Sequence, residues 1–251
     1  MTVADMERSL EFYIKVLGFE PVSDVEVWGT EYEQLQGIFG LRMRIVRHAA
    51  HGKRRAAERS CTMTTSRPLF IPVILGTSRQ GRMSEHVANF ILEEIRKRDG
   101  IETTLIDIRT LPFPLTDAGE AIKDPQFSAT MMRADALVLV VPEYNHGYPG
   151  LLKHVLDTNL KEYIHKAVGI CGVSAGGLGG TRVIQNLLPV MRELGLVTIF
   201  WDGNFSSVQN LFDTAGKILD PAYLKRIDKF LKELVWMAKV LRYGRENVPR
   251  E

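Results

Sequence analysis

The chain has 251 residues, 45% of them hydrophobic and 25% charged, and its formal net charge is +2. A globular protein with a sizeable core has this composition, and the small net charge excludes the strongly basic surface of a nucleic-acid-binding protein. Because no apolar run reaches the roughly 20 residues of a membrane span, we expect neither a nucleic acid nor a membrane as partner.

The two cysteines, Cys61 and Cys171, have neither a CxxC partner nor the spacing of metal ligands. This pattern predicts two unbridged thiols in a reducing compartment. The N-terminus also lacks the basic start and apolar core of a signal peptide. We therefore expect a cytoplasmic protein without a metal site.

Residues 1–48 differ in pattern from the rest of the chain. A helix is predicted over residues 6–17, where apolar residues recur at helical spacing and Gly18 follows as a C-cap. Extended segments are predicted at residues 21–28 and in the alternating run LRMRIV, residues 41–46. One helix and two strands cannot close a core, so we expect a small α+β fragment.

Two stretches of this fragment, DMERSLEFYIKVLGFEPV and EYEQLQGIFGLRMRIV, resemble the opening module of the vicinal oxygen chelate superfamily, the relatives of glyoxalases and extradiol dioxygenases. The first strand of that module, which usually carries a metal ligand in the family, has no counterpart here, and neither does the second module. The resemblance therefore transfers no metal ligand, and we interpret His48 and His51 as solvated residues. We expect a truncated glyoxalase-like fragment without chemistry of its own.

Residues 49–68 have the composition of a linker. The four cations of this segment lack the interleaved aromatic residues of a nucleic-acid-binding patch; they are Lys53, Arg54, Arg55 and Arg59. The functional domain is predicted at residues 69–251. We hypothesise that Met63 is its true start, because a short polar tail leads from there into the first buried strand.

From Leu69 onward apolar strands and amphipathic helices alternate, as in a parallel sheet covered on both faces. Five strands are predicted, at residues 70–75, 103–108, 136–141, 167–173 and 196–200. Helices are predicted at residues 84–98, 126–134, 151–160, 181–194 and 221–241. The last helix is apolar on more than one side, which indicates a homo-oligomer, with burial against its own sheet as the simpler account.

A polar loop, GTSRQGRMS, follows the first strand and leads into a helix. Gly76 allows the sharp turn, and a helix N-terminus attracts anions. The loop supplies hydroxyl, guanidinium and backbone N–H groups for a phosphate monoester from Thr77, Ser78, Arg79, Gly81, Arg82 and Ser84. In the alternative interpretation, Gly76 and Ser84 only end a strand and cap a helix.

Two further loops follow the third and fourth strands, with the sequences PEYNHGYPGLLKHVLD and SAGGLGGTR. Tyr144 offers an aromatic face, and the amide of Asn145 suits the pyrimidine edge of a flavin. The glycines after the fourth strand let the backbone approach a ring closely, although their spacing is not that of the GxGxxG fingerprint. Each loop alone is compatible with an ordinary α/β turn, but three at the carboxyl edge favour a ligand site.

GTSRQGRMS, PEYNHGYPGLLKHVLD and SAGGLGGTR, each after its own strand, resemble the NADPH-dependent FMN reductase family, which also includes quinone, azo-dye and chromate reductases. The resemblance covers about residues 68–240. It implies a flavodoxin-like, doubly wound α/β fold with five parallel strands in the order 2-1-3-4-5 and FMN between the first and third. It assigns the FMN phosphate to Thr77, Ser78, Arg79, Gly81, Arg82 and Ser84, and the isoalloxazine to Pro142, Glu143, Tyr144, Asn145, Ser174, Gly176 and Gly177. His146 is a candidate substrate contact.

The resemblance implies an NAD(P)H-dependent oxidoreductase, with NADPH or NADH as hydride donor. The flavin accepts the hydride at N5 and passes electrons to a flavin, quinone, azo compound or similar small-molecule acceptor, so no catalytic side chain is required. The main alternative is a flavodoxin-like electron carrier or redox-sensing module that holds FMN without turning over NAD(P)H. Such a carrier usually has an acidic docking surface, which this sequence lacks. A metal-dependent lyase or dioxygenase built on residues 1–48 lacks the necessary parts.

Overall fold

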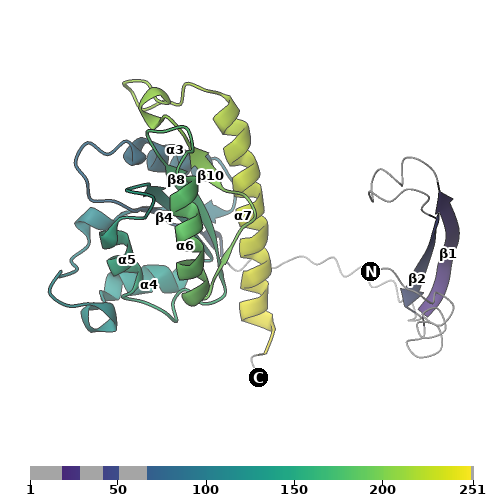
Figure 1. The fold of residues 1–251 in the computed structure, drawn as a ribbon. Coiled ribbons are helices and arrows are strands. Elements are labelled where there is room, and N and C mark those ends of the chain that lie inside the picture. Colours follow the sequence, from purple (N-terminus) through teal and green to yellow (C-terminus); the bar gives the residue numbers. More distant parts are fainter. Residues whose placement is uncertain (1–18, 29–41, 51–66, 250–251) are drawn as a thin grey trace. The chain divides into compact units, whose positions relative to one another are not determined.

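The computed structural model describes the backbone of residues 19–28, 42–50 and 67–249 and the side chains of residues 67–249. The chain divides into two compact units, Met1–Thr64 and Thr65–Glu251. In the first, β1 (Phe19–Trp28) and β2 (Arg42–Ala50) pair antiparallel, with a register shift at Pro21, which cannot donate a ladder hydrogen bond (Figure 1). Both strands predicted for this unit are therefore present, whereas the helix predicted at residues 6–17 lies outside the described residues.

The second unit is an α/β domain. The strands of its main sheet are β4 (Val73–Leu75), β6 (Leu105–Asp107), β7 (Ala136–Pro142), β8 (Lys166–Val173), β9 (Leu196–Thr198) and β10 (Gly203–Phe205). A short parallel pair, β3 (Leu69–Phe70) and β5 (Ile101–Glu102), precedes β4 and β6. The helices described in residues 67–249 are α3 (Ser84–Arg96), α4 (Pro125–Arg133), α5 (Gly150–Leu156), α6 (Thr181–Glu193) and α7 (Ala222–Asn247), with the short 3-10 helices η2 (Ile108–Thr110), η3 (Gly119–Ile122) and η4 (Val208–Asn210).

The strands of the main sheet lie in the order β10-β8-β7-β4-β6, with β9 also pairing with β8, and all of these pairs are parallel. Numbered along the chain this is the order 2-1-3-4-5, so the flavodoxin-like fold is confirmed. The first predicted strand is divided into β3 and β4. Pro72 lies between them and has no N–H to donate, although its carbonyl accepts from the Val138 N–H at 3.0 Å.

The fifth position of the sheet is shared by two strands, whereas the sequence predicted one strand at residues 196–200. β9 ends at Thr198 opposite Val168, and β10 resumes at Gly203 opposite Cys171. The outer chain thus has two more residues between these pairings than β8 has, and it bulges outward with Phe200 exposed. Gly203 permits the return, because a Cβ at this position would lie only 2.5 Å from Cys171 Sγ.

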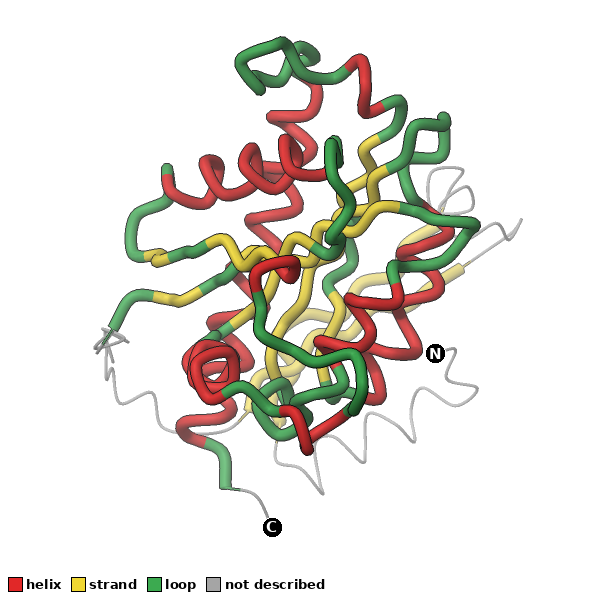
Figure 2. The backbone as a smooth tube through the Cα atoms, turned by 90° about the vertical axis from the view of Figure 1, so that its left-hand side faces the viewer, coloured by secondary structure: helices red, strands yellow, loops and turns green. Residues whose placement is uncertain are grey.

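Helices cover both faces of the sheet, and each face has its own hydrophobic core (Figure 2). α3 and α7 pack on one face through residues such as Ile91 and Leu231. α4, α5 and α6 pack on the other through residues such as Phe127, Leu152 and Val183. None of the helices described in residues 67–249 has the length and apolarity of a membrane span.

A buried carboxylate joins the two ends of this unit. Asp135, the residue before β7, is fully buried. Arg67 donates to both of its oxygens at 2.7 and 2.9 Å, Arg245 donates at 3.0 Å, and the Phe70 N–H donates at 3.1 Å. A third guanidinium, that of Arg242, lies 3.7 Å away. Because a buried carboxylate is costly unless donors compensate it, these contacts hold the start of the unit, the sheet and α7 together.

The Asp135 contacts also explain why α7 is longer than predicted. The apolar periodicity of its sequence ends at residue 241, but the helix continues to Asn247. Its last turns carry Arg242 and Arg245, which are held by polar partners rather than by apolar burial. Hydrophobic spacing therefore could not predict this end of the helix.

Replacing Asp135 with Asn tests the importance of this buried carboxylate. We expect the free energy of unfolding to fall by about 3 kcal/mol, because buried guanidinium groups would lose their anion. Urea denaturation of the full chain measures this change. Glu93→Gln is the control, since it removes an exposed ion pair with Arg96 and should change stability by less than about 1 kcal/mol. Equal effects of the two substitutions would contradict this prediction.

Candidate functional site

Three loops meet at the carboxyl edge of the sheet. We call them loop A (residues 76–83, after β4), loop B (143–149, after β7) and loop C (174–180, after β8). Thr77 Oγ1 of loop A lies 3.0 Å from Tyr144 OH of loop B. The Glu143 N–H of loop B donates to the carbonyl of Val173, just before loop C, at 2.8 Å. The parallel register thus brings the three predicted motifs into one surface.

Loop A has a buried base and an exposed tip. Thr77 is buried and accepts from the Arg79 N–H at 3.3 Å, whereas Ser78 and Arg79 are exposed. Gly76 allows the close turn, because a Cβ there would lie 3.1 Å from the Val140 carbonyl oxygen. Gly81 has φ +63°, a conformation that favours glycine. The exposed tip therefore presents one hydroxyl and one guanidinium to solvent.

Arg82 supports loop A from below. Its guanidinium is almost completely buried and donates to both oxygens of Asp107 and to the carbonyl of Thr77. Burial of Asp107 opposes its ionisation, but the hydrogen bonds from Arg82 and from the Arg109 N–H, together with the positive charges of both arginines, outweigh this cost and lower the pKa of the carboxyl. The charge of Arg82 is thus neutralised within the protein, and its geometry fixes the backbone of loop A.

The first residue of α3 carries a buried hydroxyl. Ser84 is 2% exposed, and its Oγ has no hydrogen-bond partner among the residues that the structure describes. Buried polar groups normally have partners. The hydroxyl lies at a helix N-terminus, where the dipole favours an anion, so it marks this end of loop A as a place for a polar ligand.

Loop B contains a tight turn with an uncommon backbone. Tyr144 and Gly147 exchange backbone hydrogen bonds of 3.0 and 2.9 Å around Asn145 and His146. Both central residues have positive φ, +48° and +67°, as in a type I′ turn. A non-glycine residue in this region costs on the order of 1–3 kcal/mol and requires support from its surroundings.

This support comes from the first turns of α6. The Arg182 N–H donates to a carboxylate oxygen of Glu143 at 3.2 Å, and the Arg182 guanidinium lies 2.9 Å from His146 Nε2. The Asn186 amide donates to the carbonyl of His146 at 2.5 Å. The carboxylate of Glu143 is therefore directed toward the N-terminus of α6, and the imidazole of His146 is held by Arg182.

Loop C offers open backbone. Ser174 Oγ donates to the carbonyl of Gly176 at 3.0 Å, and the Ser174 N–H donates to the carbonyl of Phe205 at 3.0 Å. A Cβ built on Gly176 or Gly177 would meet nothing within 4 Å. These two glycines are exposed, so a flat ligand would meet no side chain there.

The structure places the predicted residues at different depths. Exposed or partly exposed at the carboxyl edge are Ser78, Arg79, Gly81, Glu143, Tyr144, Asn145, His146, Ser174, Gly176 and Gly177, whereas Thr77, Arg82, Ser84 and Pro142 are buried. Sequence reasoning missed Asp107, Arg182 and Asn186. Asp107 ends the second strand, so the rule that placed the other residues at the carboxyl edge could have identified it. Arg182 is the last residue of the motif SAGGLGGTR, but no signal in the sequence links its side chain, or that of Asn186, to loop B.

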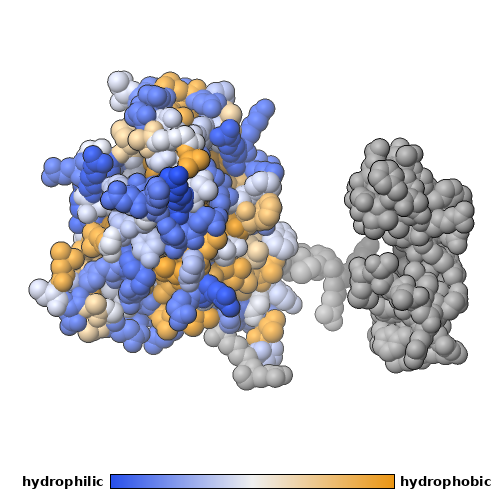
Figure 3. Space-filling view, viewed as in Figure 1, coloured by the Kyte–Doolittle hydropathy of each residue, from blue (hydrophilic) through white to orange (hydrophobic). Residues whose placement is uncertain are grey.

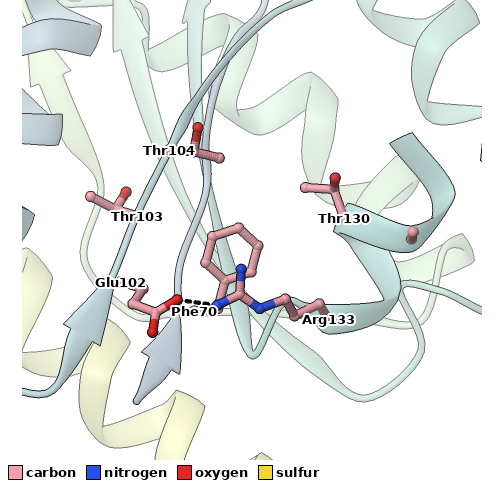
Figure 4. A pocket seen from close by; sticks show the side chains of 7 residues that line it. Phe70, Glu102, Thr103, Thr104, Thr130 and Arg133 are labelled. Atoms are coloured by element: carbon pink, nitrogen blue, oxygen red, sulfur yellow. Dashed lines mark hydrogen bonds and ion pairs between the residues drawn. The ribbon is translucent and has the colours of Figure 1, made fainter. Parts of the chain in front are cut away.

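A cavity of about 590 Å³ opens at the opposite end of the sheet (Figure 4). It is lined by residues of β3, β5 and α4, and Arg133 lies over the Phe70 ring, 4.2 Å from its centroid. Arg133 also pairs with Glu102. Its charged groups are thus paired with each other, the hydroxyls of Thr103 and Thr130 donate to backbone carbonyls, and ligands of open α/β sheets bind at the carboxyl edge. The three loops are therefore the better candidate site.

Comparison with known families agrees with this arrangement. Residues 70–206, more than half of the chain, match the family model of the NADPH-dependent FMN reductases. The chain belongs to this family. Membership confirms the resemblance found in the three motifs, and it confirms flavin reduction with NAD(P)H as the class of chemistry predicted from the sequence.

Individual relatives share moderate identity with this FMN reductase family member. An NADPH azoreductase from Bacillus sp. (strain OY1-2) is 31% identical over 120 residues, which are 46% of this chain and 64% of the relative. An NAD(P)H-dependent FMN reductase from Pseudomonas aeruginosa is 29% identical over 150 residues, 56% of this chain and 81% of the relative. The solved structure of FerB, a flavoenzyme NAD(P)H:(acceptor) oxidoreductase from Paracoccus denitrificans, shares the fold, with a TM-score of 0.56, 21% identity and coverage of 68% of this chain and 98% of FerB.

The N-terminal part matches a different family. Residues 1–63 match the model described as the Glyoxalase/Bleomycin resistance protein/Dioxygenase superfamily, which confirms the second resemblance. The matched region extends beyond residue 48, and β2 also continues to Ala50. The domain limits at 1–48, 49–68 and 69–251 stay predictions, and the side chains of His48 and His51 lie outside the described residues.

Replacing Asp107 with Asn tests the support of loop A. The free energy of unfolding at pH 7 should fall by about 2 kcal/mol, less than for a fully buried pair. Because the folded pKa of Asp107 is lowered, the wild type should lose this contribution as the pH falls below about 4, so the two stability curves converge in acid. Glu85→Gln removes the exposed partner of Arg82 and should change stability by less than about 1 kcal/mol. Parallel curves for wild type and D107N would refute this account.

Proposed function

We propose that the second unit is an NAD(P)H-dependent FMN oxidoreductase whose flavin binds across loops A, B and C. The observation that carries this proposal is the 3.0 Å contact between Thr77 and Tyr144, because it joins the loop suited to a phosphate to the loop suited to an aromatic ring. When bound, FMN supplies the hydride-accepting and electron-passing chemistry. The residues described here bind and orient it.

The phosphate end of FMN is assigned to loop A and the start of α3. Ser78 and Arg79 are exposed there, and the guanidinium of Arg79 forms no ion pair within residues 67–249. The buried hydroxyl of Ser84 and the α3 dipole add attraction for an anion. The N-terminus of α6 is a poorer choice, because the protein's own Glu143 carboxylate already occupies it.

The ring end of FMN is assigned to loops B and C. Tyr144 and Asn145 offer an aromatic face and an amide, and Gly176 and Gly177 leave their surface free of side chains. Amide donors near the pyrimidine edge stabilise the negative charge that collects there on reduction. Thr77, Arg82 and Glu143 serve this surface by holding the loops in place.

The acceptor is proposed to be a small molecule such as a flavin, a quinone or an azo compound. The azoreductase and FMN reductase relatives support this class. NADPH is the proposed donor, with NADH as the alternative. His146 remains a proposed substrate contact, although its imidazole nitrogen already contacts Arg182.

Homo-oligomerisation and a cytoplasmic location remain proposals. α7 buries Ile227, Leu231 and Leu234 against its own unit, which supports the simpler account of its apolar residues, but Trp236 and Tyr243 are exposed. The face in Figure 3 is mostly hydrophilic with separate apolar patches. Light scattering coupled to size exclusion would measure the mass of the full chain and decide the oligomeric state.

Anaerobic reduction tests the proposed activity. NADPH or NADH added to the FMN-loaded full chain should bleach the visible absorption band of the flavin. The rate constant of this bleaching should be on the order of the turnover rates of ordinary enzymes, about 1–1,000 per second. Addition of a quinone or azo dye should then restore the colour. A protein that binds FMN but is not bleached by either nucleotide would instead be the electron carrier considered above.

Substitutions in loop B test the assignment of the ring end. Asn145→Ala and Tyr144→Phe should each raise the FMN dissociation constant about fivefold. The first removes the amide, and the second removes the hydroxyl that joins loop B to Thr77; each group is worth about 1 kcal/mol. Fluorescence titration of the flavin-free full chain measures this constant. Tyr243→Phe, on the exposed side of α7, is the matched control and should leave it unchanged. Unaltered FMN affinity in both loop B variants would refute the assignment of the isoalloxazine ring to this loop.

A further inference from the structure

We propose that Arg182 and Asn186 of α6 are positioning residues, which hold the turn of loop B in the shape that the flavin ring requires. This inference rests on the proposed function and adds to it two residues that the sequence did not assign to the site: Arg182, the last residue of the motif SAGGLGGTR, and Asn186, which lies beyond that motif. Neither residue is assigned to FMN itself. They act through Glu143 and His146.

The turn needs such support because of its residues. Asn145 and His146 both have positive φ, and the pair that forms this turn without strain is Asn-Gly. His146 occupies the position where glycine would be favoured. Without contacts from outside the loop, the backbone of loop B would therefore populate other conformations, and Asn145 would not keep one position at the carboxyl edge.

Two side chains, one helical turn apart on α6, hold the turn through different groups. Asn186 donates to the carbonyl of His146 at 2.5 Å, and this contact fixes the backbone. Arg182 Nη1 lies 2.9 Å from His146 Nε2 and 3.6 Å from a carboxylate oxygen of Glu143. Because a guanidinium only donates, Nε2 of His146 is the acceptor in this contact.

Loop B is thus fixed from two sides. Thr77 contacts Tyr144 on the side of loop A, and the α6 residues hold Glu143 and His146 on the side of loop C. The turn with Asn145 at its tip lies between these attachments. We call the contacts of Arg182 and Asn186 with Glu143 and His146 the α6 clamp.

The double variant Arg182→Ala/Asn186→Ala removes the side-chain contacts of the α6 clamp and keeps the backbone bond from residue 182 to Glu143. We expect the FMN dissociation constant of the full chain to rise at least tenfold, measured by fluorescence titration. Hydrogen exchange of the peptide with residues 143–147 should also be faster in the flavin-free protein. The matched control is Gln185→Ala/Arg192→Ala, which changes two exposed residues of the same helix and should alter neither quantity.

A suppressor separates positioning from general stability. Adding His146→Gly to the double variant should recover most of the lost FMN affinity, because glycine adopts positive φ without help. A variant that was merely destabilised would not be rescued, since glycine makes the unfolded chain more flexible. Failure of this rescue would overturn the positioning role.

The outcomes also separate this inference from the proposed function. If the wild type binds FMN and the double variant binds it equally well with unchanged loop exchange, the α6 clamp is refuted and the proposed function stands. If the wild type itself does not bind FMN, the proposed function is refuted. Unchanged loop exchange in the double variant refutes the α6 clamp in either case.

Discussion

The parallel pairing of β7 with both β4 and β8 is the constraint on which the rest of this molecule depends. It aligns Leu75 with Val140 and Pro142 with Val173, so the chain leaves all three strands at the same edge. The buried backbone of these strands is satisfied by the pairing itself, and their apolar side chains fill two cores. The loops therefore carry polar residues for binding while the sheet sets their separation.

Charge pairing then gives the loops their shape. The buried Arg82 is neutralised by Asp107 beneath loop A, and Arg182 is paired with Glu143 beside loop B. Both pairs join a loop to a neighbouring element of regular structure. The guanidinium of Arg82 is engaged in this way, whereas Arg79 is exposed and is the cation of loop A that we propose for the phosphate.

The same principle operates at the opposite end of the sheet. Asp135 accepts hydrogen bonds from the guanidinium groups of Arg67 and Arg245, which lie at the two ends of the unit. This buried carboxylate therefore joins the start of the domain to the end of α7. Apolar burial builds the layers, and paired charges fix their ends and loops.

The amino-acid sequence by itself determined most of the strands and helices and the three motifs, because apolar periodicity and loop chemistry are local properties. The strand order was expected only from the resemblance of these motifs to a known family. Tertiary structure alone decided which residues of the candidate site are buried, exposed or paired. The sequence treats Arg79 and Arg82 alike as phosphate ligands, but only the fold shows that Arg82 is buried against Asp107. It likewise decided the bulge between β9 and β10 and the extra turns of α7, since both depend on partners distant in sequence. The sequence gives the charge of each side chain. The group that neutralises this charge depends on which distant segments the fold brings into contact.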